Sequence, residues 1–168
     1  MIKHEDIISF YNYKDSFAKF ALDFFGLETN QDMDSRELSL RDPEELVVAH
    51  IVWKTLFNQC QTFMVACANS KVADYWQRRV LDALSQLPEY MKTELRVKRG
   101  EIDTGTACRV LFQRVHENTG RGMTLSGLYV IEPHMLGERV HHEFMCSILP
   151  TMLSGKQNRQ IIQYSRYF

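Results

Sequence analysis

The segment Arg121–Leu136 constrains the fold most strongly, because it joins a short apolar run to a carboxylate. Residues Leu128–Ile131 are apolar, rich in β-branched and aromatic side chains, and bounded by Gly127 and Pro133. Such a run is typical of a strand that is buried on both faces of a parallel sheet. Glu132 follows directly, and open α/β sheets bind their ligands at the carboxyl ends of the strands. In nucleotide hydrolases an acid at this point holds a metal or polarises the attacking water. The pattern therefore indicates either an acid in a ligand crevice or a core strand whose first loop residue is acidic.

The length and charge of the chain limit the classes of protein to which it can belong. A length of 168 residues favours a single domain, residues 1–168, in which residues 1–30 form an N-terminal helical segment. A net charge of -1 gives no overall attraction to nucleic acid or to an anionic membrane. No signal peptide and no apolar run of membrane-spanning length is present, and the four cysteines form no CxxC pair. We therefore expect a reduced, cytoplasmic protein without membrane contacts.

The order of apolar patterns predicts an α/β fold. Helices are expected over Asp15–Phe25, Asp42–Phe57, Asn69 or Ser70 to Leu87, and Val140–Ile148. Strands are expected at Thr62–Ala68, Leu95–Val97, Glu101–Asp103, Ala107–Arg114, Leu128–Ile131 and Gln160–Ser165. The turn at Thr104-Gly105 indicates an antiparallel hairpin, whereas Met33–Arg41 fits an edge strand or a loop and Thr151–Gly155 a turn. This alternation predicts a mostly parallel sheet flanked by helices.

The ends of two of these helices carry polar residues that matter for the site. Asp42 is a suitable N-cap for the second helix, Pro43 fits its first position, and Glu45 completes a capping box. On the third helix, Arg78 and Arg79 are expected on the outer face.

Four local features resemble one family of phage proteins. They are Val47–Ala49 after a loop, Phe63–Ala68 followed by a capped helix ending in Leu84–Pro88, Arg121-Gly122 before an apolar strand, and Ser147–Gly155 before Ile161–Ser165. In order and spacing they are similar to the ATPase domain of the large terminase subunit, the DNA-packaging motor of tailed phages. The resemblance covers roughly residues 30–165 and implies the P-loop ATPase architecture.

The resemblance fails at the residues that a terminase uses to bind phosphate. A phosphate loop needs glycine, lysine and a hydroxyl residue to hold phosphates and magnesium. The corresponding positions read Pro43, Glu44 and Glu45, which remove a backbone N–H donor and introduce negative charge.

Two further family motifs also differ. The acidic pair expected after the apolar strand reads Ile131-Glu132, and the coupling motif reads Tyr164-Ser165-Arg166. The chain ends at Phe168, so we expect it to lack the nuclease domain that follows in terminases.

These departures predict a non-catalytic, terminase-like protein of phage or prophage origin. We expect Glu132 to be a vestigial catalytic residue, and we expect no nucleotide site, cofactor or metal. The expected partners are a terminase, another phage packaging protein or DNA in the host cytoplasm, and a homo-oligomer is compatible with this reading.

One alternative is an ATPase of the packaging motor with an unorthodox nucleotide site that uses Glu132 and an arginine such as Arg121. A second is a nucleic-acid-binding module that uses basic residues, with Arg96, Lys98, Arg99 and Arg121 as candidates.

Histidine and cysteine residues give a weaker signal. His134, His141, His142 and Cys146 lie close together in sequence, and His142 and Cys146 would be one turn apart on a helix and could share a metal. No fourth ligand occurs at a fixed spacing, and no serine or cysteine hydrolase motif is present. We therefore expect neither a zinc site nor a catalytic nucleophile.

Overall fold

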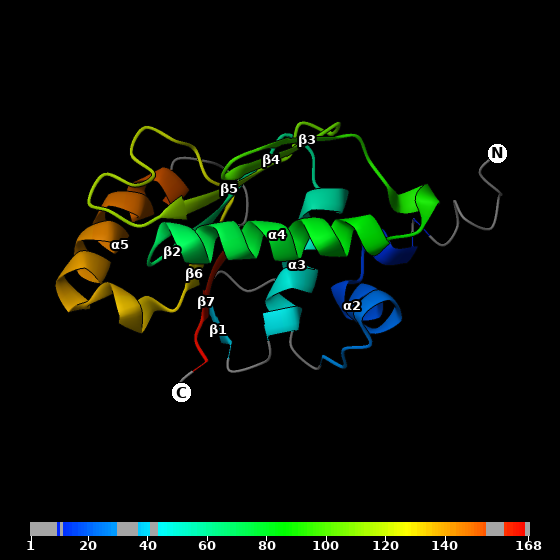
Figure 1. Ribbon diagram of the computed structural model, residues 1–168, viewed down its shortest axis with the longest axis horizontal. Coiled ribbons are helices and arrows are strands. Elements are labelled where there is room, and N and C mark those ends of the chain that lie inside the picture. The colour runs from blue at the N-terminus through cyan, green and yellow to red at the C-terminus, as the bar shows by residue number, and fades with distance from the viewer. Residues whose placement is uncertain (1–9, 11, 30–36, 41–43, 154–159, 167–168) are drawn as a thin grey trace.

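The computed structural model describes residues 10, 12–29, 37–40, 44–153 and 160–166 of the chain. Helices pack around one seven-stranded sheet, whose strand order is β1-β7-β6-β2-β5-β4-β3 (Figure 1). The strands are β1 (Glu37–Leu40), β2 (Thr62–Cys67), β3 (Leu95–Lys98), β4 (Glu101–Thr104), β5 (Arg109–Arg114), β6 (Gly127–Ile131) and β7 (Gln160–Tyr164). The described helices are α2 (Phe17–Phe25), α3 (Glu44–Phe57), α4 (Ser70–Gln86) and α5 (Glu138–Leu153), with short 3-10 helices η1 (Glu89–Met91) and η2 (Pro133–Leu136).

The sheet is parallel on one side and antiparallel on the other. Strands β1, β7, β6, β2 and β5 pair in parallel. Strands β3, β4 and β5 form an antiparallel meander at the opposite edge. The predicted mostly parallel sheet with an antiparallel hairpin is therefore confirmed, and β2 lies at its centre.

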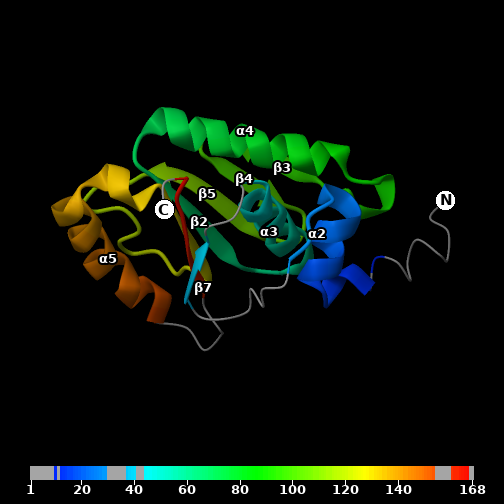
Figure 2. The ribbon, with the colours of Figure 1, turned by 90° about the horizontal axis from the view of Figure 1, so that it is seen from below.

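Helices cover both faces of the sheet. Along β2, Phe63 and Val65 pack with α2, α3 and α4, whereas Met64 and Ala66 pack with α5 on the other face. The view in Figure 2 separates the same two layers, with α5 on the opposite side of the sheet from α3 and α4. Burial on both faces explains why the parallel strands read as continuous apolar runs.

Side chains at the helix ends fix where the helices begin and end. The side-chain oxygen of Asn69 accepts a hydrogen bond from the backbone N–H of Val72 at 3.0 Å, so Asn69 caps α4. Ser16 caps α2 in the same way, and Gly26 ends α2 in the left-handed conformation with a φ of 65°. Asp42, the predicted N-cap of the second helix, and Pro43, predicted at its first position, lie outside the described residues.

Two boundary predictions were wrong. Helix α5 continues to Leu153, through the predicted turn at Thr151, because Ile148 and Met152 are buried beneath the sheet and hold the last turns in place. Strand β5 begins at Arg109, since Ala107 has a left-handed φ of 58°. The segment that fitted an edge strand or a loop contains β1, which pairs with β7 at the edge of the sheet, so the edge-strand alternative is confirmed. None of the described helices is long and apolar enough to span a bilayer.

Candidate functional site

Glu132 lies at the carboxyl edge of the parallel strands, directly after β6. Its backbone is left-handed, with a φ of 52°, and its N–H donates a hydrogen bond to the carbonyl oxygen of Tyr164 at 2.7 Å. Pro133 then begins η2. The turn buries the Glu132 side chain beside the end of β7, leaving the residue 7% exposed. The predicted position of Glu132, at the carboxyl end of an apolar strand, is therefore correct.

The chain's own donors occupy the Glu132 carboxylate. The Ser165 hydroxyl donates to Oε2 at 3.1 Å, and the Arg166 backbone N–H lies 3.3 Å from both carboxylate oxygens. The Arg166 Nε atom is 3.8 Å from Oε1, and His134 Nδ1 is 3.5 Å from Oε2. Both oxygens of the acid thus have partners within the protein.

Glu44, in the first turn of α3, binds two arginines and a tyrosine. Its Oε1 atom accepts hydrogen bonds from the Tyr75 hydroxyl at 2.5 Å and from Arg79 Nε at 3.1 Å. Its Oε2 atom accepts a hydrogen bond from the Arg166 guanidinium. The hydrogen bond to Glu44 raises the pKa of Tyr75, and it is also the main cause that raises the pKa of Arg166.

Arg166 joins these two acids into one set, Glu44, Tyr75, Arg79, Glu132 and Arg166, which we call the carboxylate network. The first turn of an α-helix is a natural anion site, because its backbone N–H groups are free and the helix dipole is positive there. In α3 the anion near this turn is Glu44, which is only 9% exposed. The first turn of α3 thus lies beside the carboxylate of Glu44, a group of the chain itself, at a type of site that binds phosphate in other proteins.

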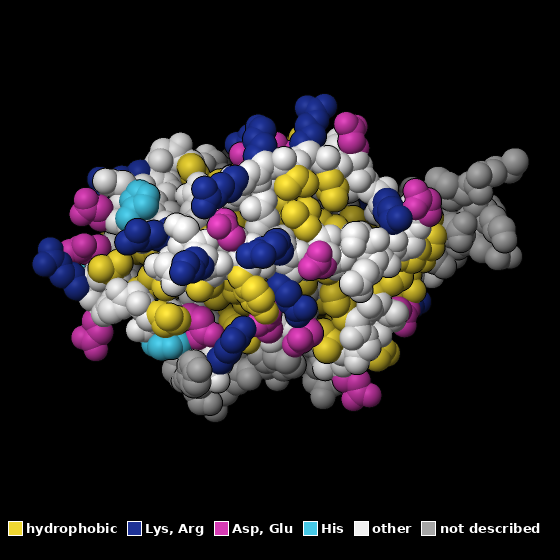
Figure 3. Space-filling view, viewed as in Figure 1, with side chains coloured by type: hydrophobic (Ala, Val, Ile, Leu, Met, Phe, Trp, Pro, Cys, Tyr) yellow, Lys and Arg dark blue, Asp and Glu magenta, His cyan; other side chains and the backbone are white. Residues whose placement is uncertain are grey.

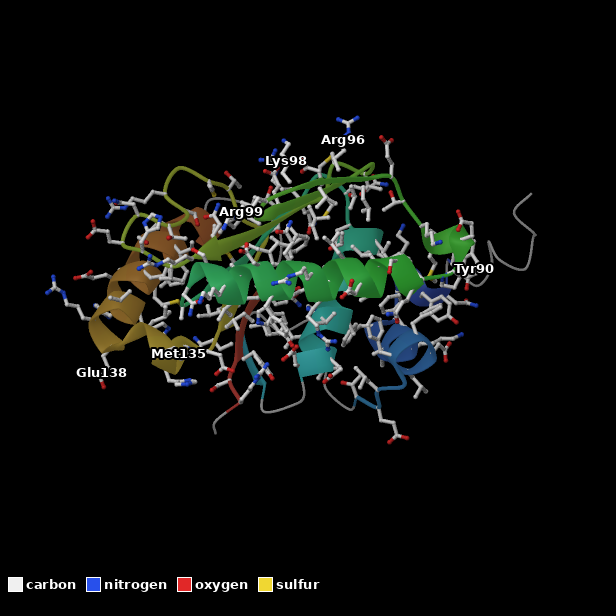
Figure 4. All side chains as sticks on the ribbon, in the orientation of Figure 1. Tyr90, Arg96, Lys98, Arg99, Met135 and Glu138 are labelled. Carbon is white, nitrogen blue, oxygen red and sulfur yellow. The ribbon has the colours of Figure 1, made fainter. Side chains whose placement is uncertain are left out.

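A cleft of about 480 Å³ opens beside the carboxylate network. Its lining residues come from α4, η2 and the ends of β6 and β7: Lys71, Val72, Tyr75, Trp76, Glu132, Met135, Tyr164 and Arg166. Figure 3 shows hydrophobic side chains among charged ones below α4. One of the apolar lining residues, Met135, is 55% exposed and is labelled in Figure 4. The cleft thus offers an apolar wall next to paired charges, a composition typical of ligand pockets.

Three of the predicted nucleic-acid-binding residues lie together at the β3 edge. Figure 4 shows Arg96 and Lys98 pointing away from the sheet, with Arg99 in the turn that follows. Strand register sets Asp103 opposite Arg96 and Glu101 opposite Lys98. Both carboxylates form ion pairs with Arg109 on β5, Glu101 at 3.0 Å and Asp103 at 3.2 Å.

Two ion pairs reduce the charge at this edge. Arg99 is 3.4 Å from the Asp74 carboxylate, and Arg96 is 3.9 Å from that of Glu94. Arg121, the fourth candidate, instead lines a separate hollow against α5 and does not join this group.

The histidines that cluster in sequence separate in space. His134 contacts Ser165 at 3.1 Å, whereas His142 Nε2 lies 3.6 Å from Cys146 Sγ on α5. Within the described part of the chain, no group of three or more histidine, cysteine or acidic side chains is arranged to hold a metal.

Sequence reasoning missed the arginine and tyrosine partners of Glu44. Arg79 was expected on the outer face of its helix, but it is only partly exposed and pairs with Glu44 and, at 3.3 Å, with Glu45. The available signal was the spacing of Tyr75 and Arg79, which places both side chains on one face of α4.

Solved structures of phage large terminases share this architecture. The large terminase ATPase domain of Thermus phage P74-26 aligns with a TM-score of 0.63 and 14% identity, over 84% of this chain and 67% of that chain. The large terminase of bacteriophage HK97 aligns with a TM-score of 0.64 and 10% identity, over 91% of this chain and 38% of that one. The large terminase of the thermophilic bacteriophage D6E gives a TM-score of 0.55 and 11% identity, over 90% and 37%.

The chain spans well under half the length of the HK97 and D6E terminases. No protein-family model and no curated protein sequence matches it. The likeness rests on the arrangement of helices and strands, and on this ground the chain has the fold of the large terminase ATPase domain.

Proposed function

We propose that this chain is a non-catalytic, terminase-like protein of phage or prophage origin that acts in DNA packaging by binding protein or DNA. The observation that supports this most directly is the carboxylate of Glu44 at the start of α3, bound by Arg79 and Arg166. The family resemblance aligns this position with the phosphate loop of a terminase. The cations that would bind a phosphate there are already paired with an internal acid.

The charge of Glu44 opposes nucleotide binding at this position. Two unit negative charges about 4 Å apart repel by roughly 4 kcal/mol at the effective dielectric near a protein surface. A triphosphate would also have to draw Arg79 and Arg166 away from a carboxylate that is nearly buried. Leaving that carboxylate without partners has a further cost of several kcal/mol.

The carboxylate of Glu132 is likewise bound by groups of the chain itself. A catalytic acid must reach a metal or a water molecule, whereas both oxygens of Glu132 already accept hydrogen bonds from Ser165 and Arg166. Arg166 also places a positive charge 3.8 Å from the oxygen to which a magnesium ion would bind. This arrangement favours a structural role for Glu132.

Hydrolysis of Mg-ATP tests the proposal. The purified chain and its Glu132→Gln variant would be assayed with and without double-stranded DNA. We expect both proteins to show the background rate of buffer alone, because neither has a nucleotide site. Turnover above background that is lost in the Glu132→Gln variant would overturn the proposal in favour of an ATPase with an unorthodox site.

Binding of DNA through the β3 edge is the second candidate function. The side chains of Arg96 and Arg99 are 78% and 84% exposed, so they can reach phosphates. The test is the affinity for a labelled duplex at several salt concentrations, using a variant with Arg96→Glu, Lys98→Glu and Arg99→Glu. Salt-sensitive binding lost in this variant but retained in Arg121→Glu would support this interface. Equal binding by the wild type and the triple variant would exclude it.

A further inference from the structure

Strand β3 lies at an edge of the sheet, and one of its sides is unpaired. It is the last strand in the order of the sheet and pairs only with β4 among the described strands (Figure 1). Three of its residues, Arg96, Val97 and Lys98, are exposed. An edge strand presents backbone N–H and C=O groups to which another strand can bind. The free side of β3 is therefore a candidate docking site for an extended segment of chain.

The hydrogen bonds between β3 and the chain beside it show which backbone groups point outward. The Gly105 N–H donates to the carbonyl oxygen of Glu94 at 2.9 Å, and the next pair along the ladder is Leu95 opposite Thr104. Antiparallel pairs alternate between hydrogen-bonded and non-hydrogen-bonded. The N–H and C=O groups of Leu95 and Val97 therefore point away from β4, so each of these residues offers a donor and an acceptor to a partner strand.

Charge alternates from strand to strand on one face of the meander. Arg109 on β5, Asp103 on β4 and Arg96 on β3 lie opposite one another in the register of the sheet. Asp103 and Glu101 both form ion pairs with Arg109, and within the described part of the chain neither acid pairs with Arg96 or Lys98. The row reads positive, negative, positive. A strand added beyond β3 would continue this alternation with acidic side chains.

The other charges near this edge leave Arg96 and Lys98 accessible to a partner. Arg99 lies 3.4 Å from the Asp74 carboxylate, so it already has an acidic neighbour. Glu94 lies 3.9 Å from Arg96, in an ion pair whose two side chains are 76% and 78% exposed. Such an exposed pair is weak and does not prevent Arg96 from binding a second carboxylate.

The opposite face of β3 is apolar. Val97 is 49% exposed, although Ile102, which lies directly opposite it on β4, is fully buried. Leu95 is partly buried and packs against the same core as Ile102. An apolar side chain on an added strand would cover Val97 from its open side. The edge therefore favours acidic residues on one face of a partner strand and apolar residues on the other.

We propose that β3 binds an extended acidic segment of a partner protein, which adds an antiparallel strand to the sheet. In this segment acidic residues alternate with apolar ones, so that the acidic side chains pair with Arg96 and Lys98 and an apolar one covers Val97. A second copy of β3 fits less well. A two-fold axis at Arg96 or at Val97 would set Arg96 opposite another Arg96 or opposite Lys98. The inference rests on the binding role proposed above and names the chemistry of the partner.

The test uses a short fluorescent peptide in which glutamate alternates with valine. Its affinity for the whole chain would be measured by anisotropy, beside an Arg96→Gln, Lys98→Gln variant and an Arg121→Gln, Arg139→Gln variant. The second variant loses the same charge at α5 instead. We expect the affinity to fall about tenfold in the first variant and to change less than about twofold in the second. No binding by the wild type, or equal losses in the two variants, would overturn the proposal and leave the ATP hydrolysis test unaffected.

Hydrogen exchange separates strand addition from attraction between charges alone. The bound peptide should slow exchange at the amides of Leu95 and Val97, which point outward, and leave the amide of Arg96, which faces β4, nearly unchanged. Duplex DNA could be attracted by the same cations but would not protect alternate amides. Binding of a duplex at this edge, with no protection of Leu95 and Val97 by the peptide, would overturn the proposal in favour of a nucleic-acid interface. Circular dichroism of each variant establishes that it is folded.

The backbone of the peptide offers a matched control. In the proposed antiparallel pairing the valine N–H groups face β3 and the glutamate N–H groups point away from it. N-methylation of the valines should therefore abolish binding, whereas N-methylation of the glutamates should preserve it. Equal effects of the two modifications would show that the peptide does not bind as a strand.

Discussion

The carboxylate of Glu44 accepts a hydrogen bond from the guanidinium of Arg166, a residue 122 positions later in the chain. The contact joins the first turn of α3 to the residue that follows the end of β7. Arg166 also lies beside Glu132, so one side chain serves two acids that are each less than a tenth exposed. We therefore expect the stability of the fold and the response of this site to anions to depend on the same small group of residues.

Replacing Arg166 by glutamine should destabilise the fold. The change leaves two largely buried carboxylates with fewer partners, and we expect the free energy of unfolding to fall by about 1–2 kcal/mol, a value reduced because Arg166 is itself half exposed. Urea denaturation measures the difference. Arg96→Gln is the matched control, since its ion pair at 3.9 Å is highly exposed and should contribute less than about 0.5 kcal/mol. Equal effects of the two substitutions would show that the network does not stabilise the fold.

Replacing Glu44 by glutamine should open an anion site. The side chain keeps its size but loses its charge, so Arg79, Arg166 and the start of α3 would then attract an anion. We expect inorganic pyrophosphate to raise the melting temperature of Glu44→Gln but not that of the wild type. Glu45→Gln is the control, because Glu45 is exposed and contacts only Arg79 among these groups. No response of Glu44→Gln to pyrophosphate would contradict the view that Glu44 takes the place of a bound anion.

The core of the fold could be predicted from sequence because its signals are local and repeated. The continuous apolar runs of β2 and β6 indicated burial on both faces, and of the two predicted caps of α4, Asn69 or Ser70, the structure has Asn69. Glu132 could be placed at the sheet edge because it directly follows an apolar strand. These features depend on neighbouring residues, which is why pattern reasoning found them.

The carboxylate network could not be predicted, because it depends on contacts between distant parts of the chain. Arg79 reads as a solvated residue on a polar helix face, and only the packing of α4 over α3 brings it to Glu44. Arg166 read as a departure from a family motif, whereas in space it binds both acids. Likewise, Arg121 and Arg96 were both candidates for binding nucleic acid, but they line different hollows.

His50 should make the protein less stable in acid. It is fully buried between α3 and the sheet, where its Nδ1 lies 2.9 Å from the Tyr129 hydroxyl, and burial lowers its pKa well below 6.5. The unfolded chain takes up this proton below pH about 6.5 but the folded chain does not, so stability is full above that pH. It then falls by up to about 1.4 kcal/mol per unit as the pH drops toward the folded pKa.

Denaturation at pH 7, 6 and 5 tests the role of His50. A His50→Gln variant, although less stable at pH 7, should lose less stability between pH 6.5 and 5 than the wild type does. His116→Gln is the control, since it removes an exposed histidine in place of the buried one. An unchanged slope in His50→Gln would mean that this histidine is protonated in the folded state.

Gly120 should tolerate no side chain. Its φ is +82°, and a Cβ atom there would approach Ile148 Cδ1 to 2.1 Å, so Gly120→Ala must strain the backbone and displace a buried side chain. We expect a loss of roughly 2–3 kcal/mol, against about 1 kcal/mol for Gly122→Ala, whose φ of +75° is similar but whose added Cβ meets nothing within 4 Å. The melting temperatures of the two variants measure the difference. Equal losses of stability would show that the loop between β5 and β6 does not pack against α5 as described.

Titration with Mg-ATP tests the central claim most directly. A ligand at 100 times its Kd stabilises the native state by about 2.7 kcal/mol, which raises the melting temperature of a domain of this size by several degrees. Because Glu44 occupies the anion position beside α3, we predict no heat of binding in calorimetry and no thermal shift at millimolar Mg-ATP. A saturable shift that is abolished by Glu132→Gln or Arg121→Ala would contradict the claim and establish a working nucleotide site.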